Sequence, residues 1–521
     1  MFRLLNLAKI SGDKRNIIKT KSALSSHQSP TSRGIVIKST SRTLEIMSNK
    51  TKQTARIVVI GSGPSGIAAA TRLIEQGFKN VSILEAENRI GGRICTVPFG
   101  DSVVDKGAQW CHGESGNVVY NRVKDLNLLH RTGDALKTMT LVRSNKQVLN
   151  NETAFILGSA FESSLPTTPN ELNGSLGDHL TDNFWKALSA SPPVDKTIAK
   201  ELFETGKRLR CSFTASDHLF EVSRRAHLEF AQSDGEFLLN WKDKGYKSFL
   251  KVLMNAKLND AEDLGVLNGR VRLSKRLTEI NYASDEQLKL RCEDGEVITA
   301  DHVICTVSLG VLKAVHQQLF VPALPEAKVR AIKGLRIGTV NKFYLEFAEQ
   351  PLPADWIGAN FLWLEEDLDE LRGTERFWLE GVFGFHRVLH QPRLLQGWII
   401  GEHARYMETL TEEEVIEGLL WFFRKFLPFN VPHPQRFLRT QWTSNPNFRG
   451  SYSSRTNYTD ELRTGPWDLA TPLLDATGRP KVQFAGEATS KTHFSTVHGA
   501  TETGWREADR LNEYYSSRNK L

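Results

Sequence analysis

The clearest change of hydrophobic pattern along the chain lies at residues 56–77. An unbroken apolar run, Ile57 to Ile60, is typical of a buried β-strand, and the glycine-rich segment GSGPSG follows it directly. After the glycines, IAAATRLIEQG places its apolar side chains at the spacing of a helix. The pattern predicts a strand, a glycine turn and a helix in the order that holds the pyrophosphate of a dinucleotide.

Four residues of this turn and one carboxylate are candidates for cofactor binding. Gly61 permits the tight turn, Gly63 lets the backbone approach the phosphates, and Gly66 lets the helix pack closely against the strand. Ser65 lies at the helix N-terminus, where unpaired N–H groups suit an anion. A second apolar run, VSILE, ends in Glu85, 19 residues after Gly66 and near the ~20 at which a carboxylate meets the ribose hydroxyls. This carboxylate disfavours the alternative of an ordinary glycine-rich surface turn.

Three further segments have recognisable patterns. EEEVIEGLLWFFRKFL (412–427) is the clearest amphipathic helix, LTEINYA (277–283) predicts a strand, and the Ser/Asn-rich segment 163–177 predicts a surface loop.

Alternation predicts another strand around Lys342. Lys342, Tyr344 and Glu346 would share one face of this strand, and the apolar side chains would occupy the other face with Asn341. The alternation alone favours a solvated lysine on an exposed face.

Length and composition favour a large protein of more than one domain. The chain has 521 residues and 40% hydrophobic content, which allows a large core. It contains no run of about 18 uninterrupted apolar residues, and its tail after Leu511 is polar, so we expect no membrane span or C-terminal anchor. The five cysteines are odd in number and form no CxxC pair, which predicts a reducing compartment and no metal site.

The net charge of +7 is distributed unevenly. Residues 1–54 carry eleven lysines and arginines against two acids, a balance of +9, so residues 55–521 carry −2. The predicted folded part is therefore not basic. We expect no nucleic acid as a partner, because DNA-binding folds present a basic surface.

The basic leader, residues 1–54, bears on the compartment. Its Ser/Thr-rich, acid-poor composition fits a mitochondrial transit peptide better than a secretory signal. A disordered extension, and an upstream start on a protein that also begins at Met47, stay open as alternatives. The C-terminal Asn519-Lys520-Leu521 departs from the peroxisomal address S-K-L at its first residue. We expect an intracellular protein, first in the cytoplasm, with the mitochondrion and the peroxisome as alternatives.

Two further motifs connect the dinucleotide site to a flavin. RIGGRICT (89–96) resembles the second glycine motif of flavin enzymes, in which an arginine neutralises the FAD phosphates. FAGEAT (484–489), STVHGA (495–500) and GWREADRL (504–511) resemble the C-terminal FAD-binding segment of the flavin-containing amine oxidases, and most closely that of the animal polyamine oxidases. With matches such as KGAQWCHG (106–113), the resemblance covers about residues 55–513.

The resemblance implies an α/β fold with a Rossmann-like FAD-binding domain of the glutathione-reductase type, interleaved with a mixed α+β substrate domain. The FAD domain would be assembled from residues 55–133, 245–334 and 440–513, and the substrate domain from residues 134–244 and 335–439. Residues 514–521 would form a polar tail. FAD would be bound non-covalently, since no cysteine lies near the C-terminal flavin motif, where monoamine oxidases bond theirs.

The resemblance also implies FAD contacts outside the glycine turn. These are Gly92, Arg93, Gln109, Trp110, Leu277, Trp442, Glu487, Thr496 and Val497. Leu277 stands where the family usually has valine for an adenine contact, and Glu487 would contact the ribityl or phosphate region. Thr496 and Val497 begin a helix whose N-terminus would stabilise a reduced, anionic flavin.

Lys342 and His112 are the catalytic residues that the resemblance implies. Lys342, in GLRIGTVNKFYLEF, would hold a water molecule at flavin N5, and burial there would depress its pKa. His112, in GAQWCHGESG, would bind or help deprotonate a substrate nitrogen, a role that suits an unperturbed pKa near ~6.5. The alternative for His112 is a structural histidine.

The implied reaction is the oxidation of a secondary amine of spermine or of N1-acetylated polyamines by FAD and O2. The products would be a shorter polyamine, an aminoaldehyde and hydrogen peroxide. The implied substrate contacts are His112, Tyr452, Phe494 and Ser495, with Trp442 as a further aromatic side chain that could attract a cation. For the distal ammonium groups the candidates are Glu114, Glu204 and Asp217.

Two alternatives stay open. One is another flavin amine oxidase, of the monoamine or histone-lysine demethylase type; the demethylase is disfavoured because the chain has no uninterrupted charged heptad run. The other is an inactive FAD-bound scaffold, against which Lys342 and His112 argue. The sequence leaves the oligomeric state open.

Overall fold

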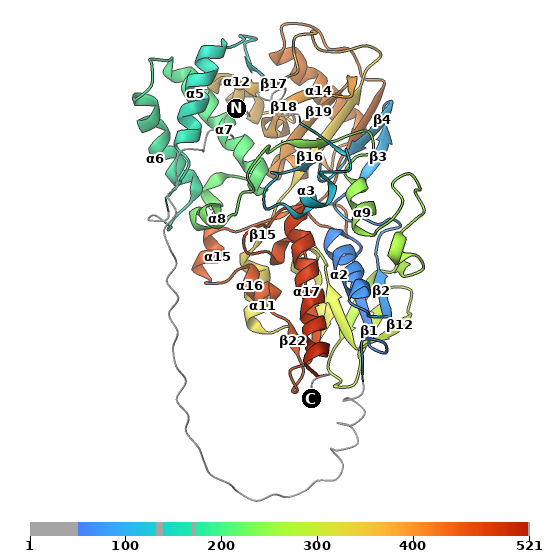
Figure 1. The fold of residues 1–521 in the computed structure, drawn as a ribbon. Coiled ribbons are helices and arrows are strands. Elements are labelled where there is room, and N and C mark those ends of the chain that lie inside the picture. Colours follow the sequence, from blue (N-terminus) through green and yellow to red (C-terminus); the bar gives the residue numbers. More distant parts are fainter. Residues whose placement is uncertain (1–49, 132–138, 169–171, 519–521) are drawn as a thin grey trace, which may run out of the picture.

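The computed structural model describes residues 50–131, 139–168 and 172–518, which form two bodies, one above the other in Figure 1. The lower body in that view is built around strand β1 (Arg56–Ile60) and helices α2 (Pro64–Glu75) and α17 (Val497–Arg518). The upper body is built around a large sheet that contains β16 (Val340–Glu346). Each body takes its elements from segments far apart in the sequence.

The lower body contains a six-stranded sheet in the order β22-β23-β13-β1-β2-β9. The strands β1, β2 (Asn80–Leu84), β9 (Val271–Arg272), β13 (His302–Cys305) and β23 (Pro480–Phe484) run parallel, and β22 (Leu473–Leu474) is antiparallel at the edge. Residues Ile57 to Val59 are buried, as expected of a parallel strand covered on both faces. The predicted α/β class with a Rossmann-like domain is confirmed.

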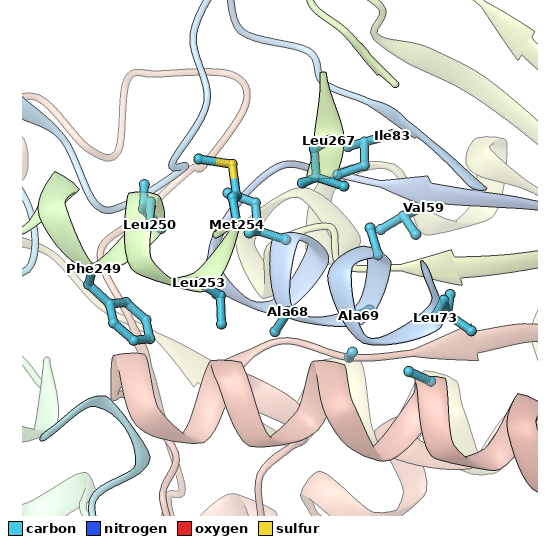
Figure 2. Close-up of a cluster of buried hydrophobic side chains, with 14 of the residues drawn as sticks. Val59, Ala68, Ala69, Leu73, Ile83, Phe249, Leu250, Leu253, Met254 and Leu267 are labelled. Atoms are coloured by element: carbon cyan, nitrogen blue, oxygen red, sulfur yellow. The ribbon is translucent and has the colours of Figure 1, made fainter. Parts of the chain in front are cut away.

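Helix α2 packs between the parallel sheet and helix α17. Figure 2 shows Ala68 and Ala69 of α2 facing the α17 ribbon, with Val59 of the sheet on the other side of α2. The close approach requires small residues: a Cβ at Gly504 in α17 would lie 2.1 Å from the backbone O of Ser65. The glycine turn that precedes α2 is thus anchored by the C-terminal helix.

Further elements complete the lower body. A second sheet has the order β12-β11-β10-β14, with β10 (Leu277–Asn281), β11 (Leu288–Cys292), β12 (Val297–Ala300) and β14 (Phe320–Val321). The helices are α3 (Val118–Val123), α9 (Lys247–Leu253), α10 (Leu309–Leu319), α11 (Glu326–Gly334), α15 (Asn457–Glu461) and α16 (Pro466–Ala470).

The upper body is a second six-stranded sheet covered by helices. Its order is β20-β16-β19-β18-β17-β7, with β7 (Thr140–Arg143), β17 (Gly358–Leu362), β18 (Val382–Val388), β19 (Gln391–Ile400) and β20 (Arg436–Arg439). The neighbouring strands are antiparallel except β17 and β7. The helices are α5 (Asn151–Ser163), α6 (Leu176–Ser189), α7 (Lys196–Thr214), α8 (Arg224–Glu229), α12 (Glu365–Arg372), α13 (Gly401–Met407) and α14 (Glu412–Phe426).

Helix α14 forms where the amphipathic pattern predicts a helix. It begins after Thr411, whose Oγ accepts a hydrogen bond from the N–H of Glu414, while the Glu414 carboxylate accepts one from the N–H of Thr411. Its apolar face packs on the large sheet, where Phe422 contacts Phe361 of β17 with ring centroids 4.7 Å apart.

Strand β16 has the predicted alternation, but neither of its faces is exposed. Phe343 and Leu345 lie in the core of the upper body. On the opposite face, the Tyr344 hydroxyl donates to the backbone O of Asp105 at 2.7 Å, and Lys342 is only 7% exposed. The solvated lysine favoured by alternation alone is wrong, because the segment around Asp105 covers the polar face.

The last residues of the predicted leader, residues 50–54, belong to the folded structure. Lys50 Nζ forms an ion pair with the buried carboxylate of Asp301 at 2.7 Å, and Lys52 Nζ donates to the Asn512 side chain. The boundary predicted at residue 54 is therefore too late by at least five residues. The rest of the predicted leader, residues 1–49, lies outside the described residues.

Two other predicted boundaries also move. Helix α17 continues to Arg518 and buries Tyr515, whose hydroxyl hydrogen-bonds His302 Nε2 at 2.7 Å, so residues 514–518 do not form a polar tail. The predicted loop 163–177 begins inside α5 and ends inside α6, and its residues 169–171 lie outside the described ones.

The five cysteines are all free and buried. Within the described ranges, no helix has both the length and the apolar character that crossing a bilayer requires.

A chain that begins at Met47 is expected to fold, bind FAD and turn over like the full chain, because it keeps the contact between Lys50 and Asp301. A chain that begins at Ala55 serves as the control. It should be less stable by about 1–3 kcal/mol, because the buried Asp301 carboxylate loses its charged donor. Flavin content and melting temperature measure both effects; loss of flavin from the chain beginning at Met47 would show that the leader is structural.

Candidate active site

One cavity of about 810 Å³ takes its lining residues from both bodies, and it extends from the β1–α2 turn to helix α7. Almost all the residues predicted from the sequence line it. They are Gly61, Gly63, Ser65, Glu85, Gly92, Arg93, Gln109, Trp110, His112, Leu277, Lys342, Trp442, Tyr452, Glu487, Phe494, Ser495, Thr496 and Val497. Gly66 does not line the cavity, because it packs behind the turn, and the three acids suggested for distal ammonium groups do not line it either.

The glycine turn has open space beside Gly63 but is tightly packed at Gly66. Gly61 has a φ of +98°, which favours glycine, and a Cβ at Gly66 would lie 2.0 Å from the backbone O of Gly61. A Cβ at Gly63 would meet no atom within 4 Å, although the residue lines the cavity. Gly63 is also the N-cap of α2, and no side chain caps this helix end. The free N–H groups of α2 are thus available to an anion.

Glu85 is held at the end of β2 by its neighbours. Oε2 accepts hydrogen bonds from the backbone N–H and the hydroxyl of Ser62 at 2.7 and 2.6 Å, and Oε1 accepts one from the backbone N–H of Glu87 at 2.8 Å. The carboxylate is buried and lines the cavity. A preorganised carboxylate after the second parallel strand suits ribose recognition.

Arg93 and Glu487 are bonded to each other, although the sequence suggested separate contacts with the cofactor. Arg93 Nη1 donates to Glu487 Oε1 at 2.8 Å and to the backbone O of Ser451 at 2.7 Å. Glu487 also accepts from the Ser453 hydroxyl at 2.6 Å and from the backbone N–H of Ser495 at 2.9 Å. Glu487 therefore fixes the turn that leads into α17.

The N-terminus of α17 also lies at the cavity. The Thr496 hydroxyl accepts from the backbone N–H of Gly499 at 3.0 Å, which is a helix cap, and Val497 is the first helical residue. Ser495 has a φ of +66°, and its hydroxyl donates to the backbone O of Ser453. This end of the helix presents its partial positive charge towards the cavity.

Lys342 lies on the cavity wall with its amine fully engaged. Nζ donates to the backbone O of Asp105 at 2.9 Å, to the backbone O of Gly107 at 2.8 Å and to Gln109 Oε1 at 2.8 Å. Burial lowers the pKa of Lys342, while three acceptors match the three N–H groups of the ammonium form and act in the opposite direction. Burial also raises the pKa of the neighbouring Asp105 carboxyl. The amide of Gln109 is held in turn by Gln396, to which its Nε2 donates at 3.0 Å.

His112 also lines the cavity, and its hydrogen bond to the backbone defines the tautomer of the imidazole. Its Nδ1 lies 3.0 Å from the backbone O of Phe237, so Nδ1 carries the proton and Nε2 is an acceptor. The imidazole packs against the Phe237 ring in a tilted arrangement, with centroids 4.5 Å apart. Burial lowers the pKa of His112 to about 4, so the ring is neutral at neutral pH. A neutral Nε2 can accept a hydrogen bond or a proton from an amine.

Aromatic side chains make up much of the remaining wall. The Tyr452 hydroxyl donates to the backbone O of Ser212, which fixes the ring, and Phe494 packs edge-on against Phe230 at 5.2 Å. Trp442 packs against Phe448 at 5.3 Å, and both line the cavity. Such walls can bind an amine through its alkyl groups and its charge.

Sequence reasoning missed several residues of this site. Trp398, Phe383 and Phe237 line the cavity, and Trp398 of β19 lies directly opposite Lys342 in the β16–β19 pair. The signal would have been this strand register, which follows from the three-dimensional pairing rather than from a local motif. Arg210 of α7 and His227 of α8 also line the cavity.

The three acids suggested for distal ammonium groups do not line the cavity. Each is in an ion pair elsewhere: Glu114 with Arg131 at 2.7 Å, Glu204 with Lys207 at 2.8 Å, and Asp217 with Arg336 and Arg405. These carboxylates are therefore already paired with cations of the chain outside the cavity.

Comparison with known proteins gives concordant results. The model of a family described as flavin containing amine oxidoreductase matches residues 64–512. The peroxisomal N(1)-acetyl-spermine/spermidine oxidase of Homo sapiens is 30% identical over 88% of this chain and 94% of its own length. Polyamine oxidase 1 of Oryza sativa subsp. japonica is 30% identical over 88% of this chain and 97% of its own length. A solved structure of a putrescine oxidase redesigned in cofactor binding has a TM-score of 0.64 and 17% identity, and the match covers 88% of this chain and 98% of that one.

Proposed function

The chain belongs to the flavin containing amine oxidoreductase family and is an oxidoreductase acting on amines, and from this premise we propose that it is an FAD-dependent polyamine oxidase. The proposed reaction is the oxidation of a secondary amine of spermine or of N1-acetylated polyamines with O2. The amine becomes an imine, and water hydrolyses the imine to a shorter polyamine and an aminoaldehyde. The two electrons end on O2 as hydrogen peroxide.

One observation carries this proposal: a single cavity joins the dinucleotide turn to a buried lysine and a neutral histidine. The open space over Gly63, the uncapped N-terminus of α2 and the fixed Glu85 carboxylate suit an adenine dinucleotide. Lys342 and His112 line the same cavity. A site that bound only a nucleotide would not need these two groups.

The chain's own residues prepare the amine for oxidation. When bound, FAD supplies the acceptor for the hydride equivalent that leaves the carbon next to the nitrogen. His112 Nε2 accepts a hydrogen bond from the substrate nitrogen, because Nδ1 is committed to the backbone O of Phe237. The aromatic walls desolvate the amine and favour its neutral form. Lys342 can hold a water molecule next to the cofactor when its Nζ exchanges one of its three acceptors, such as Gln109 Oε1, for that water.

The proposed function is tested by steady-state release of hydrogen peroxide from four amines: spermine, N1-acetylspermine, N1-acetylspermidine and spermidine. Peroxide should appear with at least one of them, together with an equal amount of aldehyde and a shorter polyamine. If peroxide is released only from simple primary monoamines, the protein is a monoamine oxidase and the proposal is contradicted.

The flavin is expected to leave with the supernatant when the purified protein is precipitated with acid. None of the five cysteines lines the cavity, so no thiol is available to bond the cofactor. The measurement is the absorbance of the supernatant and of the washed pellet. Flavin colour that stays in the pellet would mean that another side chain is bonded to the cofactor.

A further inference from the structure

The part of the cavity that extends from His112 towards helix α7 contains a positively charged side chain, Arg210. We call it the amine chamber; it is lined by Trp110, His112, Arg210, Phe213, His227 and Phe237. These residues follow one another in space: the rings of His112 and Phe237 are 4.5 Å apart, those of Phe237 and Phe213 are 6.1 Å apart, and Arg210 Cζ lies 5.4 Å from the Phe213 ring. An amine at His112 would thus extend along aromatic walls towards Arg210.

Among the described residues, no aspartate or glutamate lines the amine chamber. The carboxylates that line the whole cavity are Glu85, Glu293 and Glu487. Glu85 and Glu293 lie next to the strands of the dinucleotide end, β2 and β11, and Glu487 is bonded to Arg93. A second ammonium group of a substrate would meet a guanidinium in the chamber instead of a carboxylate, which is unfavourable.

Arg210 differs from the other arginines buried at this site. Arg455, which also lines the cavity, forms ion pairs with Glu229 and Asp460. Arg210 forms no ion pair with a described residue; its Nη2 donates to His227 Nδ1 at 3.2 Å, and its Nε is buried without a partner. A guanidinium has five N–H donors, so Arg210 can donate further hydrogen bonds to a ligand in the cavity that it lines.

The surroundings of Arg210 orient it without neutralising it. Burial and the charge of Arg210 lower the pKa of His227 to about 3, so His227 is neutral and its Nδ1 can accept. Glu162 acts on Arg210 electrostatically but does not line the cavity, and burial raises the pKa of Glu162. The Nε–H of Arg210 still has no acceptor among the described residues, and a buried charged donor requires one.

Resting on the proposed amine oxidase function, we propose that Arg210 determines substrate specificity by binding a carbonyl-type oxygen at the far end of the amine. The chemical class is an amine whose end at the chamber is acylated or carries a carboxylate. A free ammonium at that end is disfavoured by the charge of Arg210 and by the lack of a carboxylate among the described lining residues.

The test compares secondary amines that differ only in this end, with the FAD-loaded enzyme. The probes are N1-acetylspermine with an amide end, spermine with an ammonium end, and a γ-aminobutyrate with a carboxylate end whose N-alkyl group is the remaining chain of spermine. Steady-state release of hydrogen peroxide gives kcat and KM for each amine, and anaerobic flavin reduction at varied amine concentration gives the rate of the reductive half-reaction. The wild type should prefer an oxygen-ended amine to spermine by about tenfold or more. The two oxygen-ended probes distinguish the amide from the carboxylate.

Variants of Arg210 attribute this preference to the residue. Arg210→Met should remove the preference through a higher KM for the oxygen-ended amine, with little change in kcat, and Arg210→Lys should restore part of it. Arg210→Glu should shift the preference towards spermine. Arg208→Met is the matched control on the same helix, because Arg208 pairs with Glu380 and does not line the cavity; it should behave like the wild type. Flavin content shows whether each variant is folded.

Two outcomes would overturn the proposal, and they are distinguishable. If amines reduce the flavin but the wild type prefers spermine, or Arg210→Met keeps the wild-type preference, the role of Arg210 is wrong and the proposed function stands. If none of the amines reduces the flavin, the proposed function fails and the role of Arg210 fails with it. The wild-type comparison remains decisive even where a variant does not fold.

Discussion

Lys342→Met is expected to slow flavin reduction or reoxidation by more than tenfold, which corresponds to more than ~1.4 kcal/mol of barrier. Methionine keeps roughly the volume of the lysine stem but removes the amine that contacts Gly107 and Gln109 at the cavity wall. Some stability should be lost as well, about 1–3 kcal/mol, because the acceptors of Lys342 are buried. Anaerobic reduction by amine and reoxidation by O2, each per bound flavin, are the measurements.

Lys328→Met is the matched control. Lys328 is a second buried lysine whose Nζ donates to three backbone oxygens, those of Asp468, Leu469 and Thr471, but it does not line the cavity. Its replacement should lower the melting temperature and leave both half-reactions unchanged. Wild-type rates in Lys342→Met would mean that the catalytic lysine is placed wrongly; equal slowing in both variants would mean that the effect comes from destabilisation.

Gly66→Ala is expected to destabilise the dinucleotide-binding turn and to abolish flavin binding. A Cβ at this position would lie 2.0 Å from the backbone O of Gly61, and backbone cannot give way as a flexible side chain can. Overpacking of this kind costs typically 1–3 kcal/mol and here displaces the turn itself. Thermal unfolding and the flavin content of the purified protein check the result.

Gly63→Ala should separate the cofactor from the fold. Its Cβ would meet no atom of the protein within 4 Å but would project into the cavity, so the flavin-free protein should keep its stability within about 0.5 kcal/mol while flavin affinity falls. Gly373→Ala, at the end of α12 with a φ of −80°, is the surface control and should change neither property. Normal flavin binding in Gly63→Ala would contradict the assignment of the turn to the cofactor phosphates.

The parts of the site found from the sequence are those held in local motifs. The glycine turn, Glu85 and the start of α17 each combine a short pattern with the element that follows it, so their place at the cavity follows from local structure. Lys342 was placed by resemblance, and local alternation gave the wrong burial. Whether a polar strand face is solvated depends on what packs across it, and here that is the segment around Asp105.

The features that the sequence did not reveal depend on tertiary packing. Lys207, Arg208 and Arg210 lie close together in α7, and nothing local separates them. In the folded protein Lys207 pairs with Glu204 and Arg208 with Glu380, whereas Arg210 lines the cavity without an ion pair among the described residues. The end of α17 was likewise missed because Tyr515 is buried against His302, a residue more than 200 positions earlier.

Anaerobic addition of N1-acetylspermine and of spermine to the purified FAD-loaded protein tests the central claim most directly. The proposed oxidation predicts that the absorbance of the oxidised flavin is lost with at least one of these amines and returns when O2 is admitted, with one hydrogen peroxide formed for each amine oxidised. A flavin that stays oxidised in the presence of saturating amounts of both amines would contradict the account and favour an inactive FAD-bound scaffold.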